Sequence, residues 1–200
     1  MRKTTILALA ITLVVGLITI PASAQVRSPK GQAATQTGPG YGNWLEITYS
    51  RPILRGRQGI FGEGESYGQK VNAGAPVWRA GADTSTRFQT SVALKFGDTT
   101  LEAGEYSLFV NLSSATSWEL IISSHKAQAQ YDPNDKEAIW GAYGYDASKD
   151  VARVAMDVGP PTGFSMDQLT WFFTDVTETG GNLSLIWDQT IGQVPFTVVE

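Results

Sequence analysis

The chain has 200 residues, of which 42% are hydrophobic, and it contains no cysteine and one histidine. A chain of this length can bury a core of ordinary domain size, and the lack of cysteine excludes disulfides, thiol catalysis and zinc ribbons. The formal net charge of −4 argues against nucleic acid as a partner.

The first 24 residues have the layout of a secretory signal peptide. Arg2 and Lys3 precede an uncharged apolar run over residues 6–20, and Ala-Ser-Ala follows at 22–24. This run is shorter than the ~20 apolar residues that a membrane-spanning helix needs. We therefore expect cleavage after Ala24, a periplasmic or secreted location and no membrane span in the mature protein, with an uncleaved anchor as the alternative. Cleavage removes two of the 15 basic residues and none of the 19 acidic ones, which leaves 13 against 19 and a net charge of −6.

Residues 25–43 are rich in Gly, Ser, Thr, Gln and Pro, so we expect a flexible linker or an edge strand there and a single β domain over residues 44–200. Beyond residue 43, apolar and polar residues alternate with the period of two that a half-buried strand requires. The expected strands are 44–49, 88–96, a short one around Leu101, 106–112, 118–123, 151–158, 169–176, 183–187 and 194–199. Helix is tolerated only over residues 132–139. The pattern predicts an all-β fold, an antiparallel β-sandwich or jelly-roll-like domain of about eight to ten strands.

The charge is unevenly distributed along the chain. Residues 51–87 carry six Lys or Arg against three acidic residues, whereas residues 98–200 carry four against fifteen. Arginines in the basic segment alternate with glycine and aromatic residues, so their guanidinium groups could be held by neighbouring rings and aimed at a carboxylate, phosphate or sulfate. A second aromatic group follows at residues 140–145, in a long connection of the kind that often carries function. The candidate ligand-binding residues are Arg51, Arg57, Trp78, Arg79, Trp140 and Tyr143.

A structural interpretation of the same residues stays open. Arg51 or Arg79 can instead bind loop carbonyls or pair with Asp83, Trp78 can fill the core, and residues 140–146 can cover an open end of the sandwich.

Two other motifs have weaker support. Residues 64–68, Gly-Glu-Ser-Tyr-Gly, match the G-x-S-x-G nucleophile elbow, but the flanking glycine-rich sequence is not the strand and helix that the elbow needs. The acidic string at 132–137 lacks the glycine of a calcium-binding EF-hand loop. His125 is expected in a surface loop. We expect no catalytic residue, no metal site and no cofactor.

Several of these strings resemble the domain of unknown function 2911 family of exported bacterial proteins. They are Tyr49-Ser-Arg-Pro, Gly56-Arg57 with Ile60-Phe-Gly, Val77-Trp-Arg-x-Gly-Ala, Leu101-x-Ala-Gly-x-Tyr-Ser-Leu and Trp140-Gly-x-Tyr, with the strands around Trp118 and Leu183. The resemblance spans residues 28–199 and implies an exported β domain without an established activity, cofactor or catalytic residue. The chain departs from the pattern with a longer insertion at 63–75, Ala80 in place of Thr and Asp83 in place of Asn. The last of these favours an ion pair between Asp83 and Arg79.

Taken together, these features lead us to expect a non-enzymatic extracytoplasmic binding module with a basic and aromatic site for a small anionic or glycan ligand. The alternatives are a hydrolase acting on glycan or ester substrates and a structural envelope protein. The sequence leaves the oligomeric state open.

Overall fold

The computed structural model describes residues 27–160 and 162–199. The expected signal peptide, residues 1–24, lies outside this described part of the chain. Within the described part there are thirteen strands: β1 (Lys30–Thr37), β2 (Asn43–Ser50), β3 (Thr86–Thr90), β4 (Leu94–Phe96), β5 (Thr99–Leu101), β6 (Gly104–Ser114), β7 (Ser117–Ser123), β8 (Lys126–Ala127), β9 (Ala138–Ile139), β10 (Asp150–Val158), β11 (Met166–Thr177), β12 (Gly180–Asp188) and β13 (Thr190–Val198). The helical elements are short: η1 (Pro39–Tyr41), η2 (Gly64–Ser66), α1 (Gln69–Asn72) and η3 (Ala147–Lys149).

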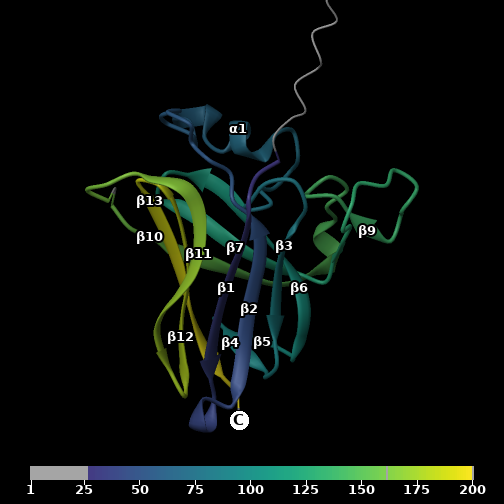
Figure 1. The fold of residues 1–200 in the computed structure, drawn as a ribbon, viewed down its shortest axis with the longest axis vertical. Helices are drawn as coiled ribbons and strands as arrows, with labels where there is room; N and C mark the ends of the chain where they lie inside the picture. The colour runs from purple at the N-terminus through teal and green to yellow at the C-terminus, as the bar shows by residue number, and fades with distance from the viewer. Residues whose placement is uncertain (1–26, 161, 200) are drawn as a thin grey trace, which may run out of the picture.

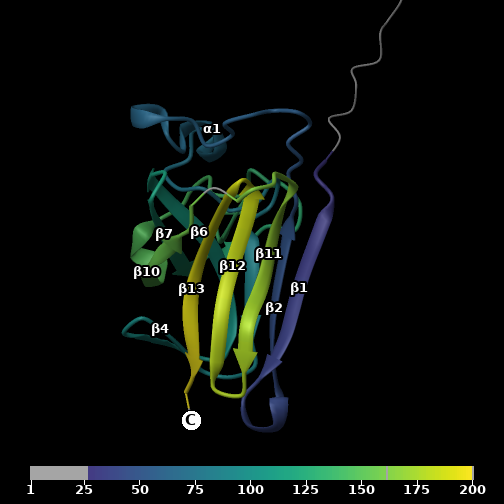
Figure 2. The same ribbon diagram turned by 90° about the vertical axis from the view of Figure 1, so that its left-hand side faces the viewer.

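The strands form two layers that share one strand. Their hydrogen-bonded order is β1-β2-β3-β6-β7-β10-β13-β12-β11, and β4 and β5 extend from β13. Along its first part β10 pairs with β7, and at Asp157 and Val158 it pairs with β13, so it joins the layers. Figures 1 and 2 show the two layers facing each other. Every pairing except the two-residue β8-β9 pair is antiparallel. The predicted all-β, antiparallel sandwich class is confirmed.

The core lies between the layers because alternate side chains of each strand point inward. In β2, Leu45, Ile47 and Tyr49 are buried, whereas Trp44 and Thr48 are exposed. Without cysteine, burial of such apolar side chains is the main stabilising contribution, at roughly 25 cal/mol per Å².

The described residues hold thirteen strands where about eight to ten were expected; nine of them have five residues or more, and β4, β5, β8 and β9 have only two or three. One expected strand, residues 88–96, is in fact two. The Thr90 hydroxyl donates to the Val92 carbonyl at 2.6 Å and accepts from the Val92 amide at 3.2 Å, so the chain turns after β3. β4 then pairs with β13 of the other layer. The alternation continues across this turn, so the sequence pattern does not reveal it.

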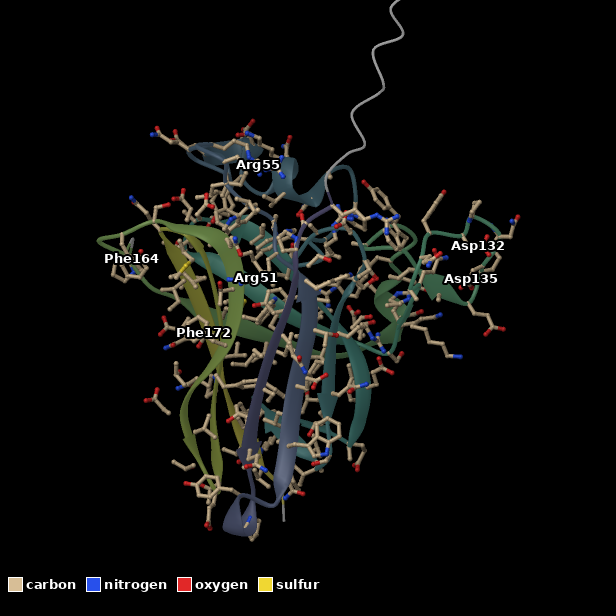
Figure 3. All side chains as sticks on the ribbon, in the orientation of Figure 1. Arg51, Arg55, Asp132, Asp135, Phe164 and Phe172 are labelled. Atoms are coloured by element: carbon tan, nitrogen blue, oxygen red, sulfur yellow. The ribbon has the colours of Figure 1, made fainter. Side chains whose placement is uncertain are left out.

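Residues 132–139 form no helix. They belong to a projecting loop that ends in β9, and Figure 3 shows Asp132 and Asp135 on it. Both carboxylates accept amide hydrogens of residues two positions further on, at 2.8 and 2.9 Å. These local bonds compete with helix formation.

The ends of the strand order, β1 and β11, lie side by side and make a seam between the layers (Figure 2). At one end of the seam the Thr37 hydroxyl donates to the Thr177 carbonyl at 2.7 Å. At the other end the chain beyond β2 crosses over to β11, where the Leu169 amide donates to the Pro52 carbonyl at 3.1 Å. Hydrogen bonds to backbone carbonyls therefore hold both ends of the seam.

Segment 52–85 covers one end of the sandwich and includes α1, at the top of Figures 1 and 2. Leu54, Ile60 and Phe61 anchor it because their side chains are buried in the core. Among the described residues, no helix has the length and apolar character needed to cross a membrane.

Candidate functional site

A small pocket lies where the covering segment meets the sandwich. Its volume is about 160 Å³, and residues from loop 52–60, α1, residues 78–82 and the end of β12 line it. We call it the basic pocket and define it by Arg57, Lys70, Trp78, Arg79 and Trp187. The structure thus brings together three of the six candidate residues, Arg57, Trp78 and Arg79, and adds Lys70 and Trp187.

Two stacked indole rings support the basic pocket. The rings of Trp78 and Trp187 have centroids 6.1 Å apart and planes 15° apart, and both residues are almost fully buried. Phe61 meets Trp78 edge-on at 5.5 Å. Backbone bonds in both directions between Trp78 and Val110, at 2.9 and 2.8 Å, fix the position of Trp78. This rigid apolar base lowers the local dielectric, so charges beside it interact more strongly than in water.

Backbone carbonyls hold the two pocket arginines. Arg57 donates from Nε to the Leu54 carbonyl at 2.9 Å and from Nη2 to the Ile53 carbonyl at 2.7 Å. Arg79 donates from Nη1 to the Asp83 carbonyl at 3.1 Å. A guanidinium group has five N–H donors, so each arginine keeps donors that no described protein acceptor occupies.

The ion pair expected between Arg79 and Asp83 does not form. Arg79 binds the backbone carbonyl of Asp83, and the Asp83 carboxylate instead accepts the Ser28 amide at 3.1 Å. A positive φ of 58° at Asp83 accompanies this arrangement.

The basic pocket has no neutralising carboxylate in the part of the chain that the structure describes. None of its lining residues is acidic. Within residues 27–160 and 162–199, the salt bridges are those of Arg87, Lys126 and Arg153. The side chains of Arg57, Lys70 and Arg79 therefore contribute three positive charges around a small volume.

Tyr143 supports the pocket from outside. The guanidinium carbon of Arg79 lies 5.7 Å from the centroid of the Tyr143 ring, a cation–π contact. The Tyr143 hydroxyl donates to the Ala73 carbonyl at 2.9 Å, just after α1. Gly141 lets this loop approach, because a Cβ there would collide with Nη1 of Arg79 and lie 3.0 Å from the Asp83 carbonyl. Tyr143 thus positions Arg79 and the α1 segment together.

The other two candidate residues lie elsewhere. Arg51 spans the seam, donating from Nε to the Leu169 carbonyl at 3.1 Å and from Nη2 to the Thr170 hydroxyl at 2.8 Å, and Figure 3 shows it between β1 and β11. Trp140 packs edge-on against Tyr131, with centroids 6.2 Å apart. Arg51 stabilises the fold at the seam, as the structural interpretation of the sequence allowed.

The G-x-S-x-G string does not make a nucleophile elbow. Ser66 ends η2, on the exposed covering segment, and its hydroxyl donates to the Glu63 carbonyl at 2.7 Å. The only histidine, His125, has its Nε2 against the backbone of Asp146. It makes no hydrogen bond with Ser66, so the two residues form no catalytic pair.

The prediction that His125 lies in a surface loop is wrong, because its side chain is 2% exposed. Its Nε2 lies 2.9 Å from the Asp146 amide nitrogen and 3.2 Å from the Asp146 carbonyl oxygen, so it accepts from the first or donates to the second according to the tautomer. Among the described residues Nδ1 has no hydrogen-bond partner. Burial lowers the pKa of His125 below its ordinary value of 6.5.

A polar network lies beside His125. Tyr145 donates to the Asp150 carboxylate and accepts from Nη2 of Arg153 at 2.7 Å, and Arg153 also donates to Glu119 at 2.6 Å. Burial, followed by the Asp150 carboxylate, raises the pKa of Tyr145. The hydroxyl therefore stays protonated as a donor, and the network fastens the 140–150 loop to β10.

The fold and the pocket together define the structural class of the protein. It is an antiparallel β-sandwich with a basic pocket beneath a covering segment at one end. Residues 28–196 match the family described as Protein of unknown function (DUF2911), and the chain belongs to that family. The family resemblance inferred from the sequence motifs is therefore confirmed. The comparisons with curated proteins and with solved structures gave no match.

Proposed function

We propose that this protein is a non-enzymatic binding module that holds a small anionic ligand in the basic pocket. One observation carries the proposal: three cationic side chains, Arg57, Lys70 and Arg79, line a pocket whose described lining contains no acidic residue. An anion there would be the natural counterion.

The arrangement favours an anion over a neutral ligand. Guanidinium groups bind carboxylate, phosphate and sulfate oxygens with charge-assisted hydrogen bonds, which are roughly twice as strong as neutral ones. The carbonyl bonds of Arg57 and Arg79 restrict their side chains before a ligand arrives, so less conformational entropy is lost on binding. Stacked Trp78 and Trp187, both almost fully buried, give the pocket a rigid base.

The experiment is a calorimetric titration of the protein with inorganic phosphate, sulfate and acetate. We expect at least one of these anions to bind, and Lys70→Ala to weaken that binding about fivefold, the effect of ~1 kcal/mol from one exposed charge. Lys70 suits the test because its ammonium group has no described hydrogen bond or ion pair.

Lys95→Ala is the matched control. Lys95 is an exposed lysine of β4, at the opposite end of the sandwich from the covering segment (Figure 1), so its loss changes the net charge equally without touching the pocket. Equal weakening by both variants would show a diffuse charge effect and reject the pocket. No binding of any of the three anions to the unaltered protein would also reject it.

The proposed location is the periplasm or the cell exterior, on the strength of the signal-peptide pattern over residues 1–24. Expression of the full chain in a bacterium, followed by cell fractionation and intact-mass measurement, tests it. The expected product begins at Gln25 and appears outside the cytoplasm. An unprocessed chain in the cytoplasm would contradict this part of the proposal.

A further inference from the structure

The basic pocket is too small for a whole ligand of ordinary size. Its volume of about 160 Å³ is below the roughly 300–1,000 Å³ of typical ligand sites. If the proposed function holds, its occupant is an acidic group, and the remainder of the ligand must lie next to the pocket.

A second pocket adjoins the basic pocket and shares Arg57 with it. Its volume is about 530 Å³, and we call it the polar pocket. The two pockets also have a common wall, because Trp187 of the basic pocket donates its indole N–H to the Asp167 carbonyl at 3.3 Å, and Asp167 lines the polar pocket. The side chains that give the polar pocket its chemistry are Gln58, Ser165, Asp167, Asp188 and Gln189.

These side chains offer both donors and acceptors. Asp167 accepts only the Arg55 amide, at 3.3 Å, and Asp188 only the Ser165 hydroxyl, at 2.7 Å, so each keeps a carboxylate oxygen without a described partner. The amides of Gln58 and Gln189 make no side-chain hydrogen bond with any described residue, and each can donate and accept at once.

Such a set fits a ligand rich in hydroxyl groups. Each hydroxyl donates one hydrogen bond and accepts up to two, so neighbouring hydroxyls need the mixture of carboxylate and amide groups found here. A purely anionic ligand would be repelled by Asp167 and Asp188, and a purely apolar one would leave their oxygens unsatisfied.

We propose that the ligand is an acidic monosaccharide or the acidic end of a saccharide. Its carboxylate or other acidic group lies in the basic pocket, and the hydroxyl groups of its ring bind Gln58, Gln189 and the two carboxylates in the polar pocket. Arg57, on the shared wall, contacts both parts.

The experiment compares D-galacturonate and D-glucuronate with neutral D-galactose, with acetate and with inorganic phosphate, by calorimetry on the full protein. We expect at least one uronate to bind about tenfold or more tightly than both galactose and acetate, since two or three added hydrogen bonds are worth about that much. Uronates that bind no better than acetate would overturn the saccharide inference, while Lys70-dependent binding of acetate or phosphate would still support the basic pocket.

The decisive variant is the double substitution Gln58→Ala and Gln189→Ala. Both side chains are exposed and neutral, so their removal leaves the charge of the protein unchanged and its unfolding midpoint nearly so. We expect uronate affinity to fall about tenfold and phosphate affinity to change less than about twofold. Unchanged uronate affinity would overturn the inference.

A second variant, Asp188→Asn, tests the carboxylate. Asp188 has a positive φ of 54°, a conformation that Asn tolerates well, and the Asn carbonyl can still accept from Ser165. We expect the ratio of uronate to acetate affinity to fall several-fold without loss of the fold, because acetate has no hydroxyl group and only gains from the lost negative charge. The contradicting outcome is that the unaltered protein binds ethanolamine and no uronate, and that Asp188→Asn abolishes the ethanolamine binding. The polar pocket would then take a cation, and the saccharide inference would be overturned.

Discussion

The side chain of Arg51 lies directly across Gly31. A Cβ at Gly31 would stand 2.7 Å from both Cγ and Cδ of Arg51, which is closer than carbon atoms pack. The absence of a side chain at Gly31 therefore lets Arg51 pass over β1 and reach the Leu169 carbonyl on β11.

Gly31→Ala should displace Arg51 and loosen the seam. We expect a loss of about 1–3 kcal/mol in the free energy of unfolding, the usual cost of adding a methyl group to a close contact. Urea denaturation measures it. Gly42→Ala is the matched control, because Gly42 has an ordinary φ of −77° and its nearest neighbour, the Pro39 carbonyl, is 3.4 Å away. Equal stability of the two variants would contradict the role given to Gly31.

Arg51→Ala should destabilise the protein without changing its affinity for anions. The substitution leaves the Leu169 carbonyl and the Thr170 hydroxyl without their donor, at a cost of about 1–3 kcal/mol. A lower midpoint in thermal unfolding, together with unchanged phosphate or uronate binding, is the expected result. If anion binding is lost while stability is kept, Arg51 belongs to the ligand site and the assignment made from the seam is wrong.

Tyr143 offers a pair of variants that separate its ring from its hydroxyl. Tyr143→Phe removes the bond to the Ala73 carbonyl but keeps the ring beside Arg79, so we expect a stability loss of about 0.5–1.5 kcal/mol and nearly normal anion affinity. Tyr143→Ala also removes the ring, and anion affinity should then fall several-fold. Calorimetry on both variants distinguishes positioning of Arg79 from support of the α1 segment. Equal anion affinities in the two variants would speak against the positioning role.

Stability should fall as the pH drops through the titration of His125. Burial lowers the pKa of this side chain in the folded state below its ordinary value of 6.5, so the unfolded chain takes up a proton first. The contribution of neutral, buried His125 to the free energy of unfolding is fully present above pH 6.5. It is lost as the pH falls from there through the pKa of the folded state.

Urea denaturation between pH 7.5 and pH 5 measures this loss. Because His125 is the only histidine, proton NMR can follow its titration without assignment work. In His125→Gln the pH dependence over this interval should flatten, since the amide can still accept from Asp146 and carries no charge. An equally steep dependence in that variant would assign the effect to carboxylates.

Much of the fold is predictable because strand alternation is a local property. The strands around Leu45, Leu108, Leu120, Val154 and Leu185 follow from the period of two alone. The split of residues 88–96 does not, because the Thr90 turn keeps the alternation intact. The burial of His125 also escapes prediction, since the Asp146 amide that satisfies it lies 21 positions further along the chain.

The site could be predicted only in part for a related reason. Arg57, Trp78 and Arg79 stand out through their motif, and the structure places them on one pocket. Lys70 is an ordinary lysine in a glycine-rich insertion, and Trp187 lies on a strand more than a hundred residues away, so neither has a sequence signal that points to the pocket. Arg51 has the same chemistry as Arg57, and only its contacts across the seam, with Leu169, Thr170 and Gly31, show where it acts.

The seam also constrains the order of events during synthesis. Residue 51 is tied to residues 169 and 170, so the two layers can be locked together only when almost the whole polypeptide has emerged. Pairings so distant in sequence form slowly, and until they form the early strands present unprotected backbone to other chains. A fragment ending before β11 would keep those edges permanently open and should therefore aggregate.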